Sequence, residues 1–206
     1  MLDCGANAVA EPSHLAQFAV MGSVYARELL GMAKPRVGVL CNGTEESKGT
    51  ELTKATAKLC VQLDLNFMGY CEGFDLFNDG VDVVVCDGFI GNIVLKTCES
   101  MSKTIGKLLK NEVKANPLRM LGGALAGGAF KALKRRLDPE VYGGAAILGV
   151  NGVVIKAHGS SRERAFASAV RVAADEIRHG IKQSILTEIA RANVKLAAST
   201  AEPTKA

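Results

Sequence analysis

Blocks of apolar residues separated by polar turns organise this chain, and the clearest block lies near its middle. Residues 81–86 form an apolar, β-branched run that is typical of a strand buried on both faces. Polar residues and glycines follow at 87–92, and from Ile93 onward apolar residues recur at spacings of four and three. This spacing predicts one face of a helix. The residues of that face are Val94, Cys98, Met101, Ile105 and Leu108. We therefore predict a strand, a turn and a helix.

Short apolar runs also alternate with amphipathic segments through the first half of the chain. Residues 1–7 are expected to end a strand in a polar turn, and Pro12 suits the first turn of a helix that stops at Gly31. Further strands are predicted at 36–41 and 66–70, and a further helix at about 51–63. Strands that alternate with helices imply right-handed crossovers. The fold class is therefore predicted to be α/β, with a mostly parallel sheet and flanking helices.

The second half of the chain is more basic and richer in glycine. Between Lys103 and Arg136 nine basic residues stand against one acidic residue, Glu112, although the whole chain carries a formal net charge of only +4. We predict a protruding helical excursion at about 103–137. An acidic partner or an anionic surface is expected for this part of the molecule alone.

The last third is predicted to hold a hairpin, a long helix and a tail. An Asn-Gly pair at 151–152 predicts a hairpin that joins residues 145–150 to 153–158. Ser160 or Ser161 is expected to cap the helix that follows. The apolar face of that helix is predicted to contain Phe166, Val170, Ala173, Ile177 and Ile181. Residues 197–206 are expected to be a disordered tail, which leaves 1–196 as one α/β domain.

Composition narrows the class of protein. The chain has 206 residues, enough for one sizeable core, and 48% of them are hydrophobic. Aromatic residues make up 5% and Trp is absent, so binding of nucleic acid by base stacking is not expected. The six cysteines form no CxxC pair, which favours a reducing compartment without structural disulfides or zinc. No secretory signal and no Walker A spacing is found, and no metal or cofactor is predicted.

Four polar loops follow apolar strands, at 3–7, 42–48, 87–92 and 156–161. If the strands lie side by side, these loops converge on one edge of the sheet, where helix N-termini offer N–H groups to anions. Carboxylates, amides, cations and hydroxyls gathered there suit a phosphate or an oxyanion. The candidate catalytic residues are Asp87, Asn92, Lys96, Lys156 and His158. The candidate substrate- or phosphate-binding residues are Asp3, Asn7, Asn42, Gly43, Lys48, Gly88, Gly91, Gly159, Ser160 and Ser161.

Structural roles are the alternative at several of these positions. The 87–92 segment is also compatible with a tight structural turn, His158 with a hydrogen-bonded structural residue, and Lys96 with a solvated outer face. No GxSxG motif is present, and no cysteine stands in an evidently activating setting. Direct attack by a bound substrate is therefore favoured over a covalent enzyme intermediate.

Six blocks of the chain closely resemble the bacterial acyl-ACP:phosphate acyltransferase family of phospholipid synthesis. They are MLDCGAN, QFAVMGSVYA, GTEESKGTELTK, VDVVVCDGFIGNIVLKT, YGGAAILGVNG and VIKAHGSS, and the similarity runs from Met1 to about Ile177. The resemblance implies a fold like that of phosphotransacetylases and isocitrate dehydrogenase-type enzymes. It also implies transfer of a fatty acyl group from acyl carrier protein to inorganic phosphate, which releases acyl phosphate.

The same resemblance implies a cytoplasmic homodimer that associates peripherally with the membrane, near a downstream membrane acyltransferase. The surface expected to meet acidic carrier protein or anionic lipid comprises Leu118, Leu121, Leu125, Phe130, Lys131, Lys134, Arg135 and Arg136. A dimer-packing helical hairpin with a solvated basic face is an alternative for this segment.

This chain departs from the family pattern in two places. Cys41 stands where the family usually has Asn, with Asn42 one place later, and Thr50 stands where the family usually has Asn after Lys-Gly. Relatives carry well over a hundred residues before the block that matches MLDCGAN, so we expect little acyl transfer without an N-terminal segment supplied in cis or in trans. The rival functions are a non-catalytic adaptor that docks carrier protein or membrane, and a phosphotransacetylase that uses acyl-CoA.

Overall fold

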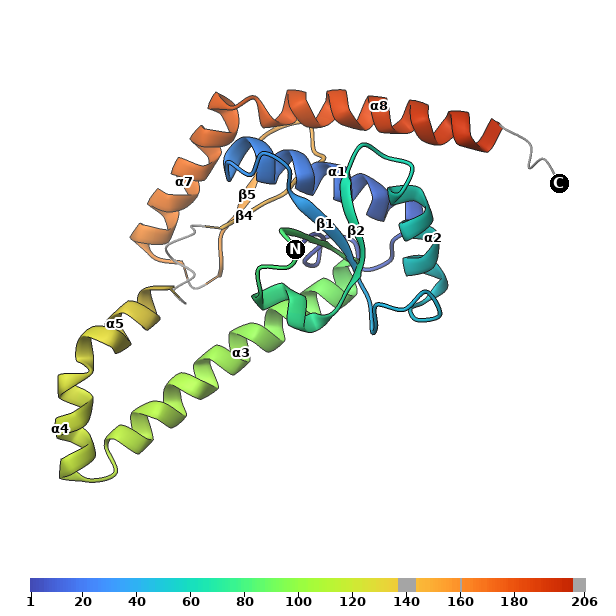
Figure 1. The fold of residues 1–206 in the computed structure, drawn as a ribbon. Helices are drawn as coiled ribbons and strands as arrows, with labels where there is room; N and C mark the ends of the chain where they lie inside the picture. Colours follow the sequence, from blue (N-terminus) through green and yellow to red (C-terminus); the bar gives the residue numbers. More distant parts are fainter. Residues whose placement is uncertain (137–143, 160, 202–206) are drawn as a thin grey trace. The chain divides into compact units, whose positions relative to one another are not determined.

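The computed structural model describes residues 1–136, 144–159 and 161–201 (Figure 1). These residues divide into two compact units. The first, which we call the sheet unit, comprises the described residues of Met1–Asn92, Leu148–Val153 and Ala174–Ala206. The second, the helical unit, comprises those of Ile93–Ile147 and Val154–Ala173. Each unit is described separately.

A parallel sheet forms the centre of the sheet unit. Its strands are β1 (Arg36–Leu40), β2 (Asn66–Cys71) and β3 (Val83–Val85), in the order β2-β1-β3. Leu2 makes an isolated parallel bridge to Val85 and so extends the sheet beyond β3. All three residues of β3 are buried, as expected for a strand covered on both faces. The predicted α/β class with a mostly parallel sheet and flanking helices is confirmed.

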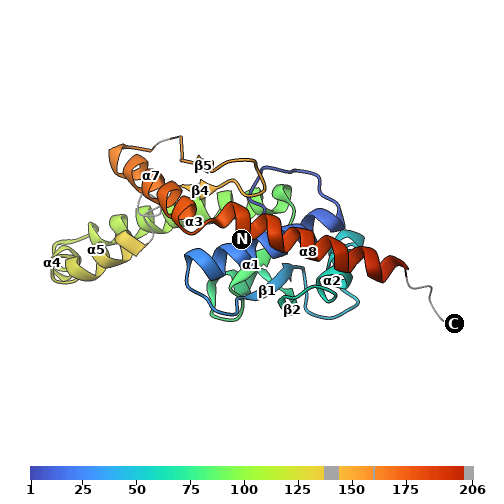
Figure 2. The ribbon, with the colours of Figure 1, turned by 90° about the horizontal axis from the view of Figure 1, so that it is seen from above.

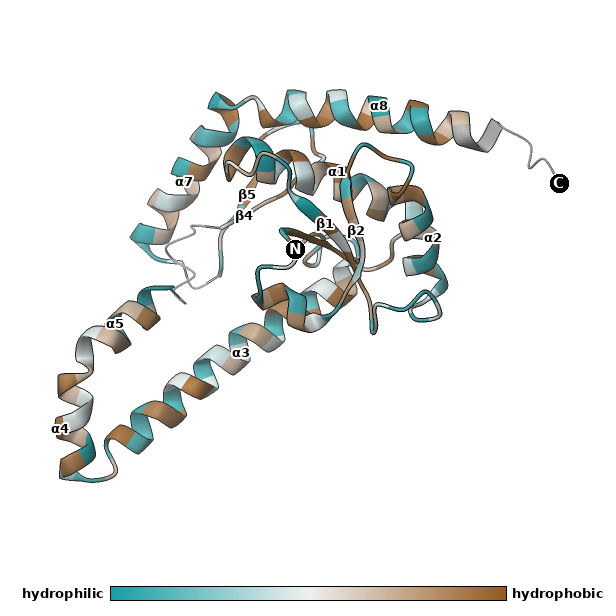
Figure 3. Cartoon of the chain, viewed as in Figure 1, coloured by the Kyte–Doolittle hydropathy of each residue, from teal (hydrophilic) through white to brown (hydrophobic). Residues whose placement is uncertain are grey.

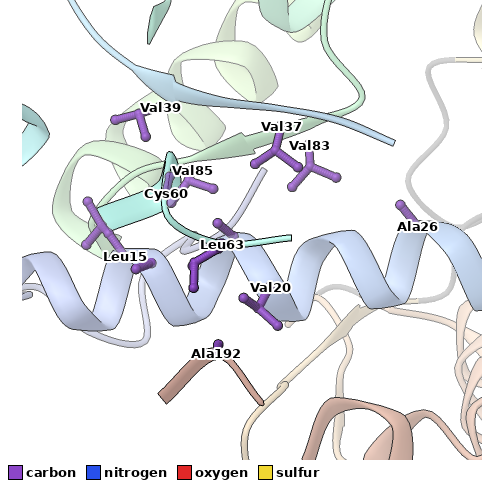
Figure 4. Close-up of a cluster of buried hydrophobic side chains, with 12 residues drawn as sticks. Leu15, Val20, Ala26, Val37, Val39, Cys60, Leu63, Val83, Val85 and Ala192 are labelled. Atoms are coloured by element: carbon purple, nitrogen blue, oxygen red, sulfur yellow. The ribbon is translucent and has the colours of Figure 1, made fainter. Parts of the chain in front are cut away.

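Helix α1 (Pro12–Leu29) packs on this sheet with its buried face. Pro12 occupies the first helical position as predicted, and Gly31 beyond the last turn adopts a left-handed φ of 70°. Figure 4 shows Leu15 and Val20 of α1 in the aliphatic core with strand residues. Other labelled members of that core are Ala26, Val37, Val39, Cys60, Leu63, Val83, Val85 and Ala192. Each fully buried aliphatic side chain there contributes on the order of 2 kcal/mol.

Two further helices complete the sheet unit. Helix α2 (Glu51–Cys60) joins β1 to β2, and a 3₁₀ turn (Gly73–Phe77) follows β2. Helix α8 (Ile181–Ala201) lies along α1 in both ribbon views (Figures 1 and 2). Its residues Ile185 and Ala192 are buried in the core of the sheet unit.

The helical unit is dominated by long and amphipathic segments. Helix α3 (Gly88–Val113) contributes its residues from Ile93 onward, and α4 (Pro117–Leu125) and α5 (Gly127–Arg136) follow it. The apolar positions of α3 and α4 are visible in Figure 3. Met101, Ile105 and Leu108 share the predicted face of α3 but are exposed. No helix among the described residues combines the length and apolar character needed to cross a bilayer.

A hairpin is present as predicted, but its strands are shorter, and the connection between them is longer than the expected two-residue Asn-Gly turn. Strands β4 (Ala145–Ala146) and β5 (Ile155–Lys156) pair in antiparallel fashion, and the Ile147 N–H donates to the Val154 carbonyl at 2.8 Å. β5 pairs with β4 in a separate two-stranded sheet.

Three predicted boundaries in the last third are wrong. The long helix is broken at Gly180, whose φ of 62° ends α7 (Glu163–Arg178) before α8 begins at Ile181. Because α7 starts at Glu163, Ser161 is too early to cap it, and Ser160 lies outside the described residues. Residues 197–201 of the predicted disordered tail belong to α8, whose alanines favour helix, and residues 202–206 lie outside the described residues.

Candidate functional site

Three of the four predicted polar loops start at one edge of the parallel sheet. They follow Leu2, β1 and β3, which are neighbours in the sheet and run in the same direction. The fourth loop follows β5, which belongs to the antiparallel pair. The expectation that all four strands lie side by side is therefore wrong for the fourth, because the Asn-Gly turn returns the chain as a hairpin.

Asp3 organises the first loop from a buried position. Its carboxylate accepts the N–H groups of Gly5 (2.8 Å), Ala6 (2.9 Å) and Asn7 (2.7 Å), and the Asn7 side-chain amide donates at 3.0 Å. Burial raises the pKa of this carboxyl, but the hydrogen bonds outweigh burial and hold the pKa below its ordinary value. With four hydrogen bonds already accepted, the carboxylate holds the turn and orients Asn7.

The first loop is also pressed against the start of α3. The Gly88 N–H donates to the Asn7 carbonyl at 2.8 Å, and a Cβ at Gly88 would lie 2.6 Å from that oxygen. A Cβ at Gly91 would overlap the Asp3 carbonyl oxygen, which also lies 3.4 Å from the Cys86 Sγ. These glycines permit the close approach of two backbone segments. We call the contact between residues 3–7 and the first turn of α3 the glycine clasp.

Residues 88–92, predicted as a loop, are the first turn of α3. Asp87 caps this helix: its Oδ1 accepts the Ile90 N–H and its carbonyl accepts the Gly91 N–H, both at 2.9 Å. The Gly88 N–H is taken by Asn7. The expectation that this turn offers its N–H groups to an anion is therefore wrong for Gly88 and Ile90. Asn92 is exposed and packs against Gly5.

The second loop is held closed by Asn42. Its side-chain oxygen accepts the Gly49 N–H at 2.9 Å, and the Lys48 N–H donates to the Glu45 carbonyl at 3.0 Å. Gly43 is buried, and a Cβ there would lie 2.7 Å from the Lys48 Cγ. The Lys48 side chain itself is exposed.

Thr50, one of the two departures from the family pattern, caps α2. Its hydroxyl accepts the Thr53 N–H at 3.2 Å, and the Thr53 hydroxyl accepts the Thr50 N–H at 2.9 Å. This reciprocal pair is a capping box. Thr therefore supplies at this position the capping oxygen that Asn would supply.

The remaining candidates belong to the helical unit. The Lys96 side chain does not point back toward the first turn of α3, because its Nζ donates to Glu99 Oε2 at 3.1 Å, further along the helix. His158 Nε2 lies 3.9 Å from the same oxygen. Sequence reasoning missed Glu99, and the only signal for it was its position one turn after Lys96. Lys156 and Gly159 are exposed, and the Ser161 N–H donates to the His158 carbonyl at 2.9 Å.

The buried cysteines are poor nucleophiles. Burial raises the pKa of Cys60, Cys71 and Cys86 to about 12 in each case. Their thiols stay protonated at neutral pH, and the thiolate is the reactive form. These three thiols are therefore unsuited to form a covalent intermediate.

Comparison with known proteins identifies the family. A family model described as "Fatty acid synthesis protein" matches residues 1–184. The chain belongs to this family. This membership confirms the predicted resemblance, and the matched residues include all four polar loops. The match ends within the first turn of α8, so most of that helix lies beyond the matched residues.

Several curated relatives carry the name phosphate acyltransferase. The chain is 45% identical over 185 residues to the protein from Geobacter sulfurreducens, a match that covers 90% of this chain and 54% of the relative. It is 47% identical over 195 residues to the protein from Akkermansia muciniphila, covering 92% and 56%. For the protein from Pelotomaculum thermopropionicum the identity is 46%, with 95% and 57% covered. The chain spans about half the length of the curated relatives it matches.

Proposed function

We propose that this chain carries machinery for phosphate acyl transfer in fatty acid and phospholipid synthesis. The observation that supports this function is the 45 to 47% identity to relatives named phosphate acyltransferase, over 90 and 92% of the chain. The proposed donor is acyl carrier protein, because acyl groups in fatty acid synthesis travel as carrier thioesters. The proposed acceptor is inorganic phosphate, and the product is acyl phosphate.

The proposed reaction needs no covalent enzyme intermediate. A phosphate oxygen attacks the thioester carbonyl carbon and a C–O bond forms. The C–S bond then breaks, and its electron pair leaves on sulfur. The proton of hydrogen phosphate passes to the departing thiolate, so the products are acyl phosphate and free thiol. The protein has to hold phosphate, stabilise the tetrahedral oxyanion and move one proton.

Phosphate binding is the role we assign to the sheet unit. Its amides are pre-oriented: Asn7 is held by Asp3 and Asn42 is held by the Gly49 N–H. Lys48 adds an exposed ammonium group to the second loop. Asp3 acts here by holding the first loop, because its oxygens already accept four hydrogen bonds. Asn92 contributes an exposed amide from the first turn of α3.

Proton transfer and charge stabilisation are the roles we assign to the helical unit. His158 is the proposed proton carrier, since imidazole is suited to accept and return a proton near neutral pH. Lys96 and Lys156 are the proposed cations for charge that develops in the transition state. The turn in which the Ser161 N–H donates to the His158 carbonyl fixes the backbone at the histidine.

Contact with acidic carrier protein or anionic lipid is assigned to α4 and α5. Leu118 and Leu125 are 79% and 82% exposed, and Leu121 is exposed on the same helix. Lys131, Arg135 and Arg136 are exposed on α5, Phe130 is partly buried, and the side chain of Lys134 lies outside the described residues. Apolar side chains beside cations suit a membrane surface. A homodimer, peripheral to the membrane in the cytoplasm and serving a membrane acyltransferase, belongs to the same proposal.

The deciding assay follows the transfer of radiolabelled phosphate into acyl phosphate with acyl carrier protein as donor. It uses the 206-residue chain alone and mixed with the part of the Geobacter sulfurreducens relative that lies outside the match. Turnover in either arm supports the proposal. Binding of carrier protein without turnover in both arms favours an adaptor, and turnover with acyl-CoA alone favours a phosphotransacetylase.

A matched pair of lysine variants tests the phosphate site. Lys48→Ala should raise the KM for phosphate about tenfold, because a hydrogen bond to a charged group contributes about 1.5 to 3 kcal/mol. Lys58→Ala, which removes an exposed lysine from α2, should leave the KM unchanged. Equal KM values in the two variants would remove Lys48 from the site.

A further inference from the structure

A small cavity lies within the sheet unit, between α1, the segment that precedes β2, and α8. It offers about 30 Å³ of space for the centres of water-sized groups. Part of its wall is apolar: Val20, Leu63 and Ala192, one from each of these segments, belong to one core cluster (Figure 4). Every residue that lines the cavity belongs to the sheet unit, so its geometry depends on that unit alone.

The cavity is separate from the candidate functional site. Residues 63–65 line it and directly precede β2, whereas the polar loops of the candidate site follow the carboxyl ends of their strands. The lining residues of α8 lie between 188 and 195, beyond residue 184, where the match to the family model ends. Phosphate acyl transfer as proposed above therefore uses no residue of this cavity.

Ser23 of α1 brings an unpaired hydroxyl group to the cavity wall. The residue is only 8% exposed, and its hydroxyl makes no hydrogen bond to any residue that the structure describes. Because burial of a hydroxyl without a hydrogen bond is unfavourable, such groups are normally paired with protein, water or a ligand. The Ser23 hydroxyl is therefore available to a polar group that enters the cavity.

Basic side chains outnumber acidic ones in the lining. The charged lining residues are Arg27, Asp64, Glu188, Arg191 and Lys195. Two of the three cations have a carboxylate partner there: Arg191 Nη1 lies 3.3 Å from Glu188 Oε1, and Lys195 Nζ pairs with Asp64. Arginine and lysine side chains only donate hydrogen bonds, so the lining has more N–H donors than acceptors. This imbalance favours a ligand that accepts hydrogen bonds and carries negative charge.

Arg27 is the cation with hydrogen-bonding capacity left. Its Nε donates to Glu28 at 2.9 Å, but its Nη2 lies 3.9 Å from Glu188 Oε1, which is too far for a hydrogen bond. Within the described part of the chain, its Nη groups therefore have no acceptor. Ser23 and Arg27 are four residues apart on α1, so both lie on one face of the helix. A guanidinium group and a hydroxyl on one face can bind the same small anion.

We propose that this cavity binds the carboxylate group of a small organic acid. One water molecule needs about 10 to 15 Å³ of such space, so the two oxygens of a carboxylate fill the cavity. The Ser23 hydroxyl donates to one oxygen and the Arg27 Nη groups donate to both, while Glu188 stays paired with Arg191. The apolar walls contact the carbon that carries the carboxylate. A tetrahedral oxyanion such as phosphate is larger and fits the same space less well.

The test is an NMR titration of the ¹⁵N-labelled 206-residue chain with sodium propionate, with sodium chloride at the same ionic strength as the reference. Amide shifts should change and saturate in residues 20–27, 63–65 and 188–195, which contain the lining. A ligand with so few atoms binds weakly, with a Kd on the order of 1 to 10 mM. None of these measurements requires turnover, so the result is independent of the acyl transfer assay.

Three variants locate the carboxylate. Arg27→Gln should raise the Kd for propionate about tenfold or more, and Ser23→Ala about fivefold, since they remove a charged and a neutral hydrogen bond respectively. The matched control is Arg178→Gln, which removes an arginine that pairs with Asp175 but does not line the cavity, and its Kd should equal that of the wild type. Circular dichroism verifies that each variant is folded.

Four results would overturn the proposal. These are the absence of shift changes in the lining segments, equal changes with chloride, and an equal rise in Kd for Arg27→Gln and Arg178→Gln. The fourth is that inorganic phosphate produces the same shift changes at lower concentration than propionate, which would assign the cavity to a tetrahedral oxyanion instead.

Discussion

Replacement of Gly91 by alanine tests the glycine clasp directly. The added methyl group would overlap the Asp3 carbonyl oxygen and lie 3.1 Å from the Cys86 Sγ. Neither obstacle is the far end of a flexible side chain, so the backbone of the first loop has to move. We expect Gly91→Ala to destabilise the sheet unit.

The expected loss of stability in Gly91→Ala is the sum of three contributions. Overpacking against a fixed neighbour costs about 1 to 3 kcal/mol. Displacement of the first loop also weakens the hydrogen bonds from the Asp3 N–H to the Cys86 carbonyl and from the Cys86 N–H to the Leu2 carbonyl, both 2.9 Å, at about 1 kcal/mol each. Alanine in place of glycine within a helix stabilises the helix by about 1 kcal/mol, which partly offsets these losses. The net loss is about 3 kcal/mol, or a fall in Tm of roughly 6 to 12 °C for a chain of this size.

The assay is urea unfolding followed by circular dichroism, with Gly106→Ala as the matched control. Gly106 lies in the same helix, and a Cβ there would meet nothing within 4 Å. Gly106→Ala should be as stable as the wild type or more stable by up to about 1 kcal/mol. If Gly91→Ala is as stable as Gly106→Ala, residues 3–7 are not held against α3, and the proposed orientation of Asn7 fails with them.

Three further predictions concern charge. Asp82→Asn should lower the free energy of unfolding by about 1 kcal/mol at pH 7, measured by urea unfolding, because Arg36 donates to both Asp82 oxygens at 2.9 Å. The Arg36 hydrogen bonds hold the pKa of Asp82 at about 2. The difference in stability from the wild type should therefore be present above pH 3.8 and disappear as the pH falls toward 2. Glu176 is 5% exposed, and its Oε1 has no hydrogen-bond partner among the described residues. Burial raises the pKa of Glu176, so the stability of the wild type should fall as the pH rises through that pKa. Glu176→Gln should remove this dependence and be about 1 kcal/mol more stable than the wild type at pH 8, but equal to it at pH 4. Replacement of Lys131, Lys134, Arg135 and Arg136 by Gln should release the chain from anionic vesicles in a sedimentation assay, at about 1 kcal/mol per charge, and retention at moderate salt would contradict the surface we propose.

Local signals in the sequence predicted much of the fold. Pro12 and Gly31 bound α1 because one residue fixes a helical φ and the other accepts a left-handed one. The apolar run 36–41 predicted β1 to within one residue, and the Asn-Gly pair predicted the β4-β5 hairpin. Each of these features depends on the conformational preferences of a few adjacent residues, which a single sequence contains.

Features that depend on distant contacts were not predictable in the same way. Gly88 and Gly91 look like loop residues because glycine is a poor helix former. Their place in α3 depends on the carbonyl groups of Asn7 and Asp3, more than eighty residues away in the sequence. The apolar face of α3 was predicted from its spacing, but spacing does not indicate whether a face is buried, and Met101 and Ile105 are exposed.

In the candidate site, too, the positions of the residues were predictable from the sequence, but their contacts were not. Asp3 and Asp87 were selected as polar residues that could meet an anion, and both follow strand-forming segments at the carboxyl edge of the sheet as expected. Both Asp3 side-chain oxygens and Asp87 Oδ1, however, accept backbone N–H groups of the chain itself, so these oxygens hold the backbone at the edge of the sheet. The exposed amides of Asn7 and Asn92 are what this shaping leaves toward solvent. A carboxylate at the end of a buried strand is therefore better interpreted as a residue that shapes an anion site than as one that contacts the anion. The contacts with the ligand should be sought among the amides and ammonium groups that the carboxylate orients.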